Sequence, residues 1–364
     1  MKHKKTVGFF GGIILIAGIL GMYFYRPVPK ISVVMSTYNR ANHLIKSIDS
    51  VLSQTEGDFE FIIINDGSTD STKRILSAFA HKDKRIKILD NDGNKGLIYS
   101  LNRGLDEARG KYIARMDDDD VSLPNRFERQ LMFMEANPDI AVAGSWIGRP
   151  DNGNTWPIQQ ETDPDGVKVD MYMNNVPIAH PAAFIRRDFL EKHSIRYNEK
   201  YVAAEDRKFW LDILDAGGKI VNIPEVLLLF RIHGTNPTEY YINQIKNKKT
   251  FWIDEIFPRF DIAKTKDFIN CQILEQMVEK NKEKKILNQT VLEKKVSNTC
   301  RKEKVSHRLW KDSFVFEGNR LCRQKFPTEC AKVISKTKDK LVIRWDKWGE
   351  ETFLRQNNEW HLSQ

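Results

Sequence analysis

Short apolar runs alternate with longer amphipathic segments from residue 30 to about residue 143. Each short run has the length and apolar content of a buried strand, and each longer segment carries apolar residues at helical spacing. The expected strands are 31–35, 59–64, 86–89, 112–116 and 140–143. The expected helices are 41–52, 70–79, 96–108 and 124–135. This alternation predicts an α/β domain with a mostly parallel, Rossmann-like sheet.

The first residues of the chain have a different pattern. Residues 1–6 form a basic tail, and residues 7–25 contain no charged side chain. A stretch of that length can cross a bilayer as a helix, with Tyr23, Phe24 and Tyr25 at the interface. The alternative is a cleaved signal peptide, which would end in small residues rather than in this bulky cluster. We therefore expect a single-pass transmembrane anchor, whose topology the flanking charges leave open.

The pattern changes again after about residue 245. Residues 268–296 are rich in Lys and Glu and carry apolar residues at helical spacing, which predicts one or two amphipathic helices. Four short runs near the C-terminus, separated by turn residues, predict a small antiparallel β domain. These runs are 331–335, 341–345, 352–354 and 360–362. We therefore expect a main domain at 30–244, a helical extension at 245–310 and the β domain at 311–364.

Composition narrows the possible partners. The 364 residues carry 58 basic and 49 acidic side chains, a net charge of +9, which suits a membrane surface or phosphate-bearing ligands. Nucleic acid is not an expected partner, because no basic motif is interleaved with aromatic residues. The four cysteines lack metal-ligand spacing, and we expect thiols, although an oxidising compartment would permit a disulfide. They are Cys271, Cys300, Cys322 and Cys330.

Polar residues follow each of the first four expected strands. The polar stretches are 36–40, 65–70, 90–96 and 117–120. Ligands of parallel sheets bind beyond the carboxyl ends of the strands, so we expect these stretches to form one binding site. Gly67, Gly93 and Gly96 are expected to serve the backbone geometry of the turns rather than to bind ligand.

The last of these stretches consists of four consecutive aspartates, Asp117 to Asp120. Like charges this close repel one another and raise each other's pKa. Carboxylate oxygens suit a hard divalent cation, Mg²⁺ or Mn²⁺. A solvated acidic turn is the alternative interpretation. We expect a metal site, because the run directly follows the apolar strand at 112–116.

Together these motifs resemble the family 2 glycosyltransferases, which have the GT-A nucleotide-sugar fold. The matching segments are 34–39, 64–70, 94–97 with Asn102, 114–120, Pro124 and Arg126. The resemblance extends from about residue 30 to residue 233. It implies an inverting transferase, and the segment after about residue 245 lies outside it.

The resemblance implies a set of positions that bind a UDP-sugar donor. They are Ser36, Tyr38, Asn39, Asp66, Asn94 and Gly96. Ser36 and Tyr38 lie where the family binds the base, and Asp66 resembles the residue that pairs with the uracil edge. The last two lie near the ribose and the diphosphate.

The aspartate run resembles the family's DxD motif. In that motif the last carboxylate, here Asp119, binds the metal, Mn²⁺ or Mg²⁺. The earlier ones, Asp117 and Asp118, reach the ribose or metal-bound water. A later segment, 231–234, resembles a closing loop whose histidine, His233, adds a ligand to the metal or to the diphosphate.

Two further motifs concern the acceptor side. Glu205 and Asp206, followed by Phe209 and Trp210, resemble the family's ED motif, in which the Asp is the general base. An acidic first turn of a helix is the alternative interpretation of this pair. The segment 175–181 resembles a loop near the acceptor, which makes His180 a candidate for substrate contact.

The resemblance implies sugar transfer to a glycan, lipid-linked or protein acceptor in surface polysaccharide or glycan synthesis. The catalytic domain would be cytoplasmic in a bacterial protein and lumenal in a eukaryotic or viral one. A nucleotidyltransferase acting on sugar phosphates is an alternative, but its Gly-rich phosphate loop does not follow the first strand. A non-catalytic, membrane-tethered glycan-binding protein is a third possibility, against which Asp66, Asp119 and Asp206 together argue.

Overall fold

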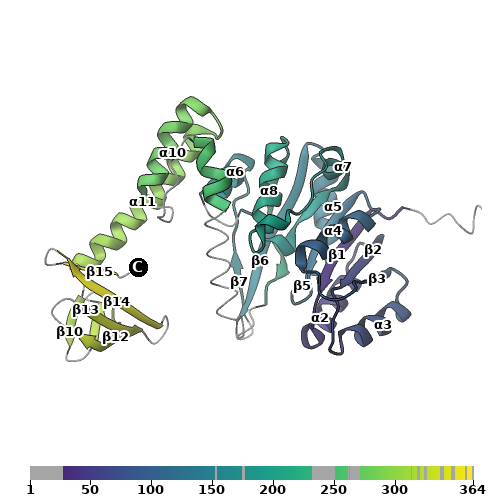
Figure 1. The fold of residues 1–364 in the computed structure, drawn as a ribbon, viewed down its shortest axis with the longest axis horizontal. Coiled ribbons are helices and arrows are strands. Elements are labelled where there is room, and N and C mark those ends of the chain that lie inside the picture. Colours follow the sequence, from purple (N-terminus) through teal and green to yellow (C-terminus); the bar gives the residue numbers. More distant parts are fainter. Residues whose placement is uncertain are drawn as a thin grey trace, which may run out of the picture. The chain divides into compact units, whose positions relative to one another are not determined.

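The structure is a computed structural model (Figure 1). It describes residues 28–151, 154–173, 177–231, 251–260, 262 and 271–312, and six strands between 314 and 362. The predicted anchor at 7–25 and His233 lie outside these residues. Within the described part of the chain, no helix is both long and apolar enough to cross a membrane.

The chain divides into two compact units. The first comprises Met1–Ile269 and Glu279–Val291, and the second comprises Asn270–Val278 and Leu292–Gln364. The described part of the first unit contains a nine-stranded sheet in the order β3-β2-β1-β4-β8-β6-β9-β5, with β7 paired to β6. The elements of each unit are given separately below.

Four parallel strands form one half of the sheet and follow the predicted pattern. They are β1 (Ile31–Thr37), β2 (Phe59–Asn65), β3 (Ile86–Asp90) and β4 (Tyr112–Asp117). Strand β1 lies between β2 and β4, and the pairs β1–β2, β1–β4 and β2–β3 are all parallel. The carboxyl ends of these strands therefore share one edge, as predicted.

The other half of the sheet is mixed. Its strands are β5 (Val121–Ser122), β6 (Ile140–Asp151), β7 (Asn154–Ile158), β8 (Phe184–Arg186) and β9 (Lys219–Leu229). Strand β8 is antiparallel to both β4 and β6, whereas β6 and β9 are parallel. The predicted strand at 140–143 is therefore only the start of a longer element.

Helices cover both faces of the parallel strands. The helices of the first unit are α2 (Ala41–Leu52), α3 (Thr72–Lys82), α4 (Leu97–Glu107), α5 (Arg126–Ala136), α6 (Pro164–Tyr172), α7 (Arg187–Lys192) and α8 (Glu205–Asp215). Val33 and Met35 of β1 belong to the same core cluster as buried residues of α2, α3 and α5. Val34 points the other way, and a Cβ on Gly104 of α4 would come within 2.4 Å of its side chain. Burial on both faces explains why β1 is apolar almost throughout.

Two helix starts differ from the predicted ones. The helix expected from residue 70 begins at Thr72, because the carboxylate of Asp70 accepts hydrogen bonds from the backbone N–H groups of Thr72 (2.9 Å) and Ala41 (3.2 Å). The helix expected from residue 124 begins at Arg126, after a turn in which the Arg126 N–H donates to the carbonyl of Leu123. Turn-forming polar side chains and Pro delay both starts.

The described part of the second unit contains an antiparallel β-sheet of six strands in sequential order. They are β10 (Phe314–Glu317), β11 (Arg320–Arg323), β12 (Phe326–Lys336), β13 (Lys340–Trp345), β14 (Gly349–Gln356) and β15 (Glu359–Leu362). The predicted antiparallel β domain is confirmed, with β10 and β11 in addition to the expected strands.

The predicted amphipathic segment forms two helices, α10 (Cys271–Lys284) and α11 (Gln289–Asp312). The expectation of thiols is wrong for Cys271 and Cys300, which form a disulfide with a Cα–Cα separation of 5.5 Å. The turn between the helices is short because the Asn281 side chain bonds both the N–H and the carbonyl of Leu287. The chain therefore reverses direction at once, and the two cysteines come together despite a sequence separation of 29.

Candidate functional site

The loops after β1 and β2 are tied together by Asn39. This residue has a left-handed backbone (φ 52°), which Asn tolerates better than most residues. Its side-chain oxygen accepts from the N–H of Thr69 at 2.8 Å, and its own N–H donates to the Ser68 hydroxyl at 3.1 Å. The structure therefore gives this predicted donor-binding residue a role in holding the two loops together.

Asp66 ties the loop after β2 to the loop after β3. Its carboxylate is 3% exposed and accepts from the Asn91 amide (2.7 Å) and from the N–H groups of Lys95 (2.8 Å) and Gly96 (2.9 Å). The exposed side chain of Asn94 accepts from the same Gly96 N–H at 3.0 Å. The predicted uracil partner thus already holds the predicted diphosphate loop in shape.

The same two loops are in backbone contact at two glycines. Gly67 and Gly93 both have positive φ, at 71° and 83°. A Cβ on Gly67 would lie 2.3 Å from the carbonyl carbon of Gly93, which leaves no space for a side chain. Glycine is therefore required here by close approach as well as by conformation.

The remaining predicted base-binding residues lie at the end of β1. Ser36 is half-buried and is the register partner of Asp117 on β4. Tyr38, two residues further along, is 41% exposed. The candidate donor residues therefore share the edge of the sheet with the aspartate run.

Three of the four aspartates converge. One ligand oxygen from each of Asp117, Asp119 and Asp120 lies within 4.8 Å of the others. Asp118 is not part of this group, is only 7% exposed, and lies 3.8 Å from the Arg40 guanidinium. Burial raises the pKa of Asp118 to about 7. The geometry adds Asp120 to the residues predicted to face a metal, whereas Asp118 lies outside the converging group.

Arginines compensate much of the charge of the run. Arg115, which is 4% exposed, pairs with Asp117, and Arg40 lies 3.9 Å from Asp119. Arg231 donates from its backbone N–H to the Asp120 carboxylate at 3.0 Å and from its guanidinium to the carbonyl of Asp119. The fold therefore supplies positive charges of its own that offset the repulsion within the run.

A fourth arginine lies beneath the run. Arg126 is fully buried and donates to the carbonyl of Arg115 at 2.8 Å and to the side chain of Gln130 at 2.9 Å. Burial, followed by the nearby charge of Arg115, lowers its pKa to about 9. Its hydrogen bonds fix the backbone of β4 from which the run emerges.

A divalent cation nevertheless fits the run. Asp120 is fully buried, and within the described residues its Oδ2 has no hydrogen-bond partner. Burial, followed by the charge of Asp117, raises the pKa of Asp120 to about 8. A buried carboxylate oxygen without a partner, next to two further carboxylates, is the donor set that Mn²⁺ or Mg²⁺ accepts.

Glu205 and Asp206 form the first turn of α8. Glu205 is partly buried, and its Oε2 has no hydrogen-bond partner in the described part of the chain. Burial, followed by the neighbouring charge of Asp206, raises the pKa of Glu205 to about 7. The Asp206 carboxylate accepts from the N–H of Arg207 at 2.7 Å. The two adjacent carboxylates thus lie in the first turn of α8, with one Glu205 oxygen left without a partner among the described residues.

Arg115 and Tyr197 connect the aspartate run to this pair. The Arg115 charge lowers the pKa of Glu205. Burial raises the pKa of the Tyr197 hydroxyl, and the negative charges of Asp206, Glu205 and Asp117 raise it further. Sequence reasoning missed both residues. The signal for Arg115 was a charged residue inside an otherwise apolar strand.

His180 joins this cluster. Its Nε2 lies 2.8 Å from the Tyr197 hydroxyl, and its ring packs edge-on against Trp210 at 5.8 Å. Burial, followed by the Arg115 charge, holds the pKa of His180 well below its usual range, so its imidazole is neutral. The structure therefore places this candidate acceptor contact against Tyr197 and Trp210.

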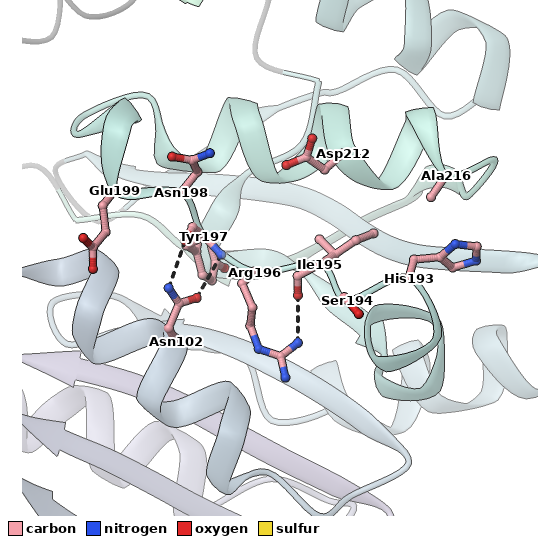
Figure 2. A pocket seen from close by; sticks show the side chains of 10 residues that line it. All are labelled: Asn102, His193, Ser194, Ile195, Arg196, Tyr197, Asn198, Glu199, Asp212 and Ala216. Atoms are coloured by element: carbon pink, nitrogen blue, oxygen red, sulfur yellow. Dashed lines mark hydrogen bonds between the residues drawn. The ribbon is translucent and has the colours of Figure 1, made fainter.

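Tyr197 is held by Asn102, which the sequence singled out without a role. The Asn102 amide donates to the carbonyl of Tyr197 (2.9 Å) and accepts from its N–H (2.8 Å), as Figure 2 shows. These two bonds dock the 193–199 loop on α4. A polar groove of about 630 Å³ opens along this loop, with Asp212 of α8 among its lining residues.

Comparisons with known proteins agree with this geometry. Residues 32–194 match the family model described as glycosyl transferase family 2. An uncharacterized glycosyltransferase of Methanocaldococcus jannaschii is 36% identical over 230 residues, which cover 61% of this chain and 77% of the relative. One of Haemophilus influenzae is 34% identical over 227 residues, 58% of this chain and 68% of the relative.

Two solved structures share the fold. One is Staphylococcus aureus TarS 1-349 in complex with UDP-GlcNAc, with a TM-score of 0.52 and 16% identity over 81% of this chain and 96% of that chain. The other is the mannosyltransferase PcManGT of Pyrobaculum calidifontis with GDP-Man and Mn²⁺. Its TM-score is 0.50 and its identity 14%, over 82% of this chain and 84% of that chain. At this identity the likeness concerns the fold alone, which is of the GT-A type.

Proposed function

The chain belongs to glycosyl transferase family 2, and from this premise we propose that it is a metal-dependent, inverting transferase that uses a UDP-sugar. One observation carries the proposal. Asp117, one of the three converging aspartates, and the Glu205–Asp206 pair all act on Tyr197, and Arg115 interacts with both Asp117 and Glu205, so we place the metal site and the candidate base in one site.

In this proposal the aspartate run holds the cation. Asp119 is the principal ligand, and the geometry adds Asp117 and the unpartnered oxygen of Asp120. Bound there, Mn²⁺ or Mg²⁺ would act as a Lewis acid on the departing diphosphate. Arg40 and Arg231, beside the same carboxylates, add fixed positive charge where the leaving group becomes negative.

On the other side, Asp206 takes the proton of the acceptor hydroxyl, with Glu205 next to it. The acceptor oxygen bonds to the anomeric carbon, and the bond from that carbon to the diphosphate breaks. The electron pair of the broken bond leaves on the phosphate oxygen. Attack from the face opposite the leaving group inverts the configuration, and the carboxylate assists by removing the proton as the bond forms.

The donor class has support from the loops and from a neighbour. Ser36, Tyr38 and the 94–96 loop line the edge that carries the metal candidates, and a structural neighbour was solved with UDP-GlcNAc. We propose UDP-sugars as donors on this basis. The proposed acceptor is a glycan, lipid-linked or protein hydroxyl in surface polysaccharide or glycan synthesis.

The test is acceptor-dependent release of UDP from a panel of UDP-sugars with Mn²⁺. We expect Asp206→Asn to lose at least about a hundredfold in kcat while it still binds UDP, because general-base catalysis typically contributes that much. Equal rates for wild type and Asp206→Asn would rule out the base assignment. Release of pyrophosphate from a nucleoside triphosphate would instead indicate a nucleotidyltransferase.

We also propose that residues 7–25 anchor the protein in a membrane, because they are uncharged and long enough to cross one. The full chain should sediment with membranes and resist extraction with alkaline carbonate. A variant lacking residues 1–27 should be released into the supernatant with its transfer activity intact. Retention of the truncated variant on membranes would contradict the proposal.

A further inference from the structure

The turn that precedes the acidic pair has a strained backbone. Ala203 has φ +61°, in the left-handed region, although it is not glycine. Such a conformation costs about 1–2 kcal/mol and persists only where surrounding structure holds it. Ala204 follows as the N-cap of α8, and then come Glu205 and Asp206. The direction of both carboxylates therefore depends on whatever holds this turn.

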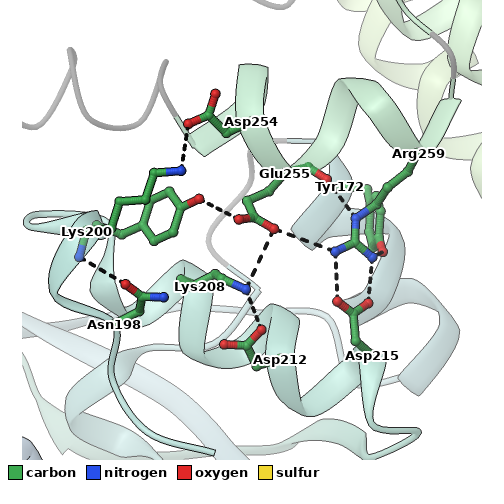
Figure 3. Close-up of polar contacts among 10 residues, drawn as sticks. Tyr172, Asn198, Lys200, Lys208, Asp212, Asp215, Asp254, Glu255 and Arg259 are labelled. Atoms are coloured by element: carbon green, nitrogen blue, oxygen red, sulfur yellow. Dashed lines mark hydrogen bonds and ion pairs between the residues drawn. The ribbon is translucent and has the colours of Figure 1, made fainter.

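The turn is held from a segment far along the chain. The hydroxyl of the buried Tyr201 donates to the Glu255 carboxylate, and the Tyr201 ring packs edge-on against Phe251 at 5.9 Å. Next to it, Lys200 pairs with Asp254 at 3.0 Å. These contacts involve the segment 251–260, which we call the bracket, and Figure 3 shows the pair of Lys200 with Asp254.

The bracket also contacts α8 near both of its ends. Lys208, in the second turn, bonds Asp212 at 2.5 Å and lies 3.6 Å from Glu255. At the last residue of the helix, Arg259 donates two hydrogen bonds to Asp215, at 2.6 and 2.7 Å. Figure 3 shows both groups converging on Glu255 and Arg259. Contacts with the bracket near both ends therefore hold α8 in position.

Apolar packing holds the bracket itself in place. It consists of the π-helical turn η3 (Trp252–Ile256) and the 3₁₀ turn η4 (Phe257–Phe260). Phe251, Ile256, Phe257 and Phe260 are each at most 2% exposed. The Phe260 ring packs edge-on against Tyr172 of α6 at 5.9 Å. Burial of four large apolar side chains is enough to fix so short a segment.

We propose that the bracket positions the Glu205–Asp206 pair for catalysis and that Glu255 is its central positioning residue. This inference rests on the proposed function, in which Asp206 is the base. Glu255 joins the strained turn, through Tyr201, to the body of α8, through Lys208, and to the end of α8, through Arg259. Loss of its charge weakens all three connections at once, while Lys208 keeps its bond to Asp212 and Arg259 its bonds to Asp215.

The expected consequence is a loss of rate rather than of donor affinity. A general base must lie within hydrogen-bonding distance of its proton, and an error of about 1 Å can cost about a hundredfold. The described contacts of the bracket fall on α6, the 3₁₀ turn η2 (Glu199–Tyr201) and α8. The candidate donor residues belong to the loops after β1 to β4.

The test compares Glu255→Gln and Tyr201→Phe with Glu225→Gln. The control removes a carboxylate of the same type from the exposed Arg129–Glu225 pair (3.0 Å) on α5 and β9. We expect kcat to fall at least about tenfold in the first two variants, with the KM for the UDP-sugar within about twofold of wild type. Glu225→Gln should leave both kcat and the KM for the UDP-sugar unchanged. Equal changes in kcat and KM for Glu255→Gln would overturn the proposal.

Rescue distinguishes positioning from general loss of stability. Glycine adopts the left-handed conformation of residue 203 without strain, so the turn would need less support. The double variant Ala203→Gly/Glu255→Gln should therefore recover at least about threefold in kcat over Glu255→Gln alone. No recovery would contradict the role of the bracket in holding this turn.

Hydrogen exchange of amides 201–208 gives a readout independent of the reaction. Faster exchange in Glu255→Gln than in Glu225→Gln supports the bracket even if no UDP-sugar is a donor, in which case only the proposed function fails. Unchanged exchange together with unchanged kcat overturns the bracket, while wild-type transfer leaves the proposed function intact. The two failures are therefore distinguishable.

Discussion

The two acidic regions of the site are stabilised in different ways. The aspartate run lies among guanidinium groups, with Arg40, Arg115 and Arg231 in contact with its carboxylates or its backbone. At the Glu205–Asp206 pair, the Arg115 charge offsets the burial of Glu205 only in part, and one Glu205 oxygen has no partner among the described residues. A run balanced by charge is formed before any ligand arrives, whereas the pair must be held in place through the backbone.

Arg115 is the residue that acts on both regions, and its loss should have the largest effect. In Arg115→Met, Asp117 loses its buried ion-pair partner, and Asp120 and Glu205 lose a nearby positive charge. Breaking a buried ion pair in this way costs about 3–5 kcal/mol of unfolding free energy. Urea unfolding measures the loss, and Arg40→Met at the exposed edge of the run is the control, with an expected loss below about 1 kcal/mol. Similar losses would show that Arg115 does not link the regions.

Metal affinity tests which carboxylates face the cation. Asp120→Asn should weaken Mn²⁺ binding about ten- to a hundredfold, because its unpartnered oxygen is one of the three converging ligands. Asp118→Asn, which changes a neighbouring carboxylate that lies outside the group, should stay within about threefold of wild type. Calorimetric titration with Mn²⁺ decides between them. A larger loss for Asp118→Asn would reverse the assignment.

The pH dependence of stability tests the raised pKa of Glu205. Its pKa is raised from 4.5 to about 7 by burial, so the folded protein binds a proton that the unfolded chain releases. The resulting stability is fully present below about pH 4.5 and is lost as the pH rises through 7. Glu205→Gln should therefore be about 1–2 kcal/mol more stable than wild type at pH 8 and nearly equal at pH 4.5. A constant difference across this range would exclude a raised pKa.

Asn102→Ala should lower the unfolding free energy by less than Arg115→Met. Its amide makes two hydrogen bonds to the backbone of Tyr197, the residue between the two acidic regions. Asn102→Ala should cost about 1–3 kcal/mol, because typical hydrogen bonds contribute about 1 kcal/mol each. Thermal unfolding measures the loss of unfolding free energy. The control, Asn137→Ala, removes one side-chain hydrogen bond to the Phe133 carbonyl and should lose about half as much. Equal losses in the two variants would show that docking of the 193–199 loop by Asn102 contributes no more to stability than a single side-chain hydrogen bond.

Local patterns were enough to predict the parallel half of the sheet and the position of the aspartate run. Period and polarity are properties of neighbouring residues, so strands such as 31–35 and the polar stretches that follow them can be identified without a structure. The resemblance to a family added candidate roles but no contacts. That Asp118 lies outside the group of converging carboxylates depends on the tertiary fold, which the spacing of residues does not record.

Contacts between distant residues could not be predicted. The bond from Tyr201 to Glu255 spans 54 positions, and the ties from Arg231 to the aspartate run span more than 100. The disulfide between Cys271 and Cys300 required knowledge that a short turn follows α10. Each depends on where helices and loops pack, which is decided by tertiary structure rather than by local propensity.

The contact of Gly67 with Gly93 has a consequence for how this edge of the sheet can change over evolutionary time. With no side chain between them, the two loops meet as bare main chain. Peptide groups are the same whatever the sequence, so a surface built from them keeps its hydrogen-bonding pattern while the residues around it diverge. Substitution at Gly67 would push the two loops apart, whereas a Cβ on Gly93 would meet nothing within 4 Å and would strain only its own backbone.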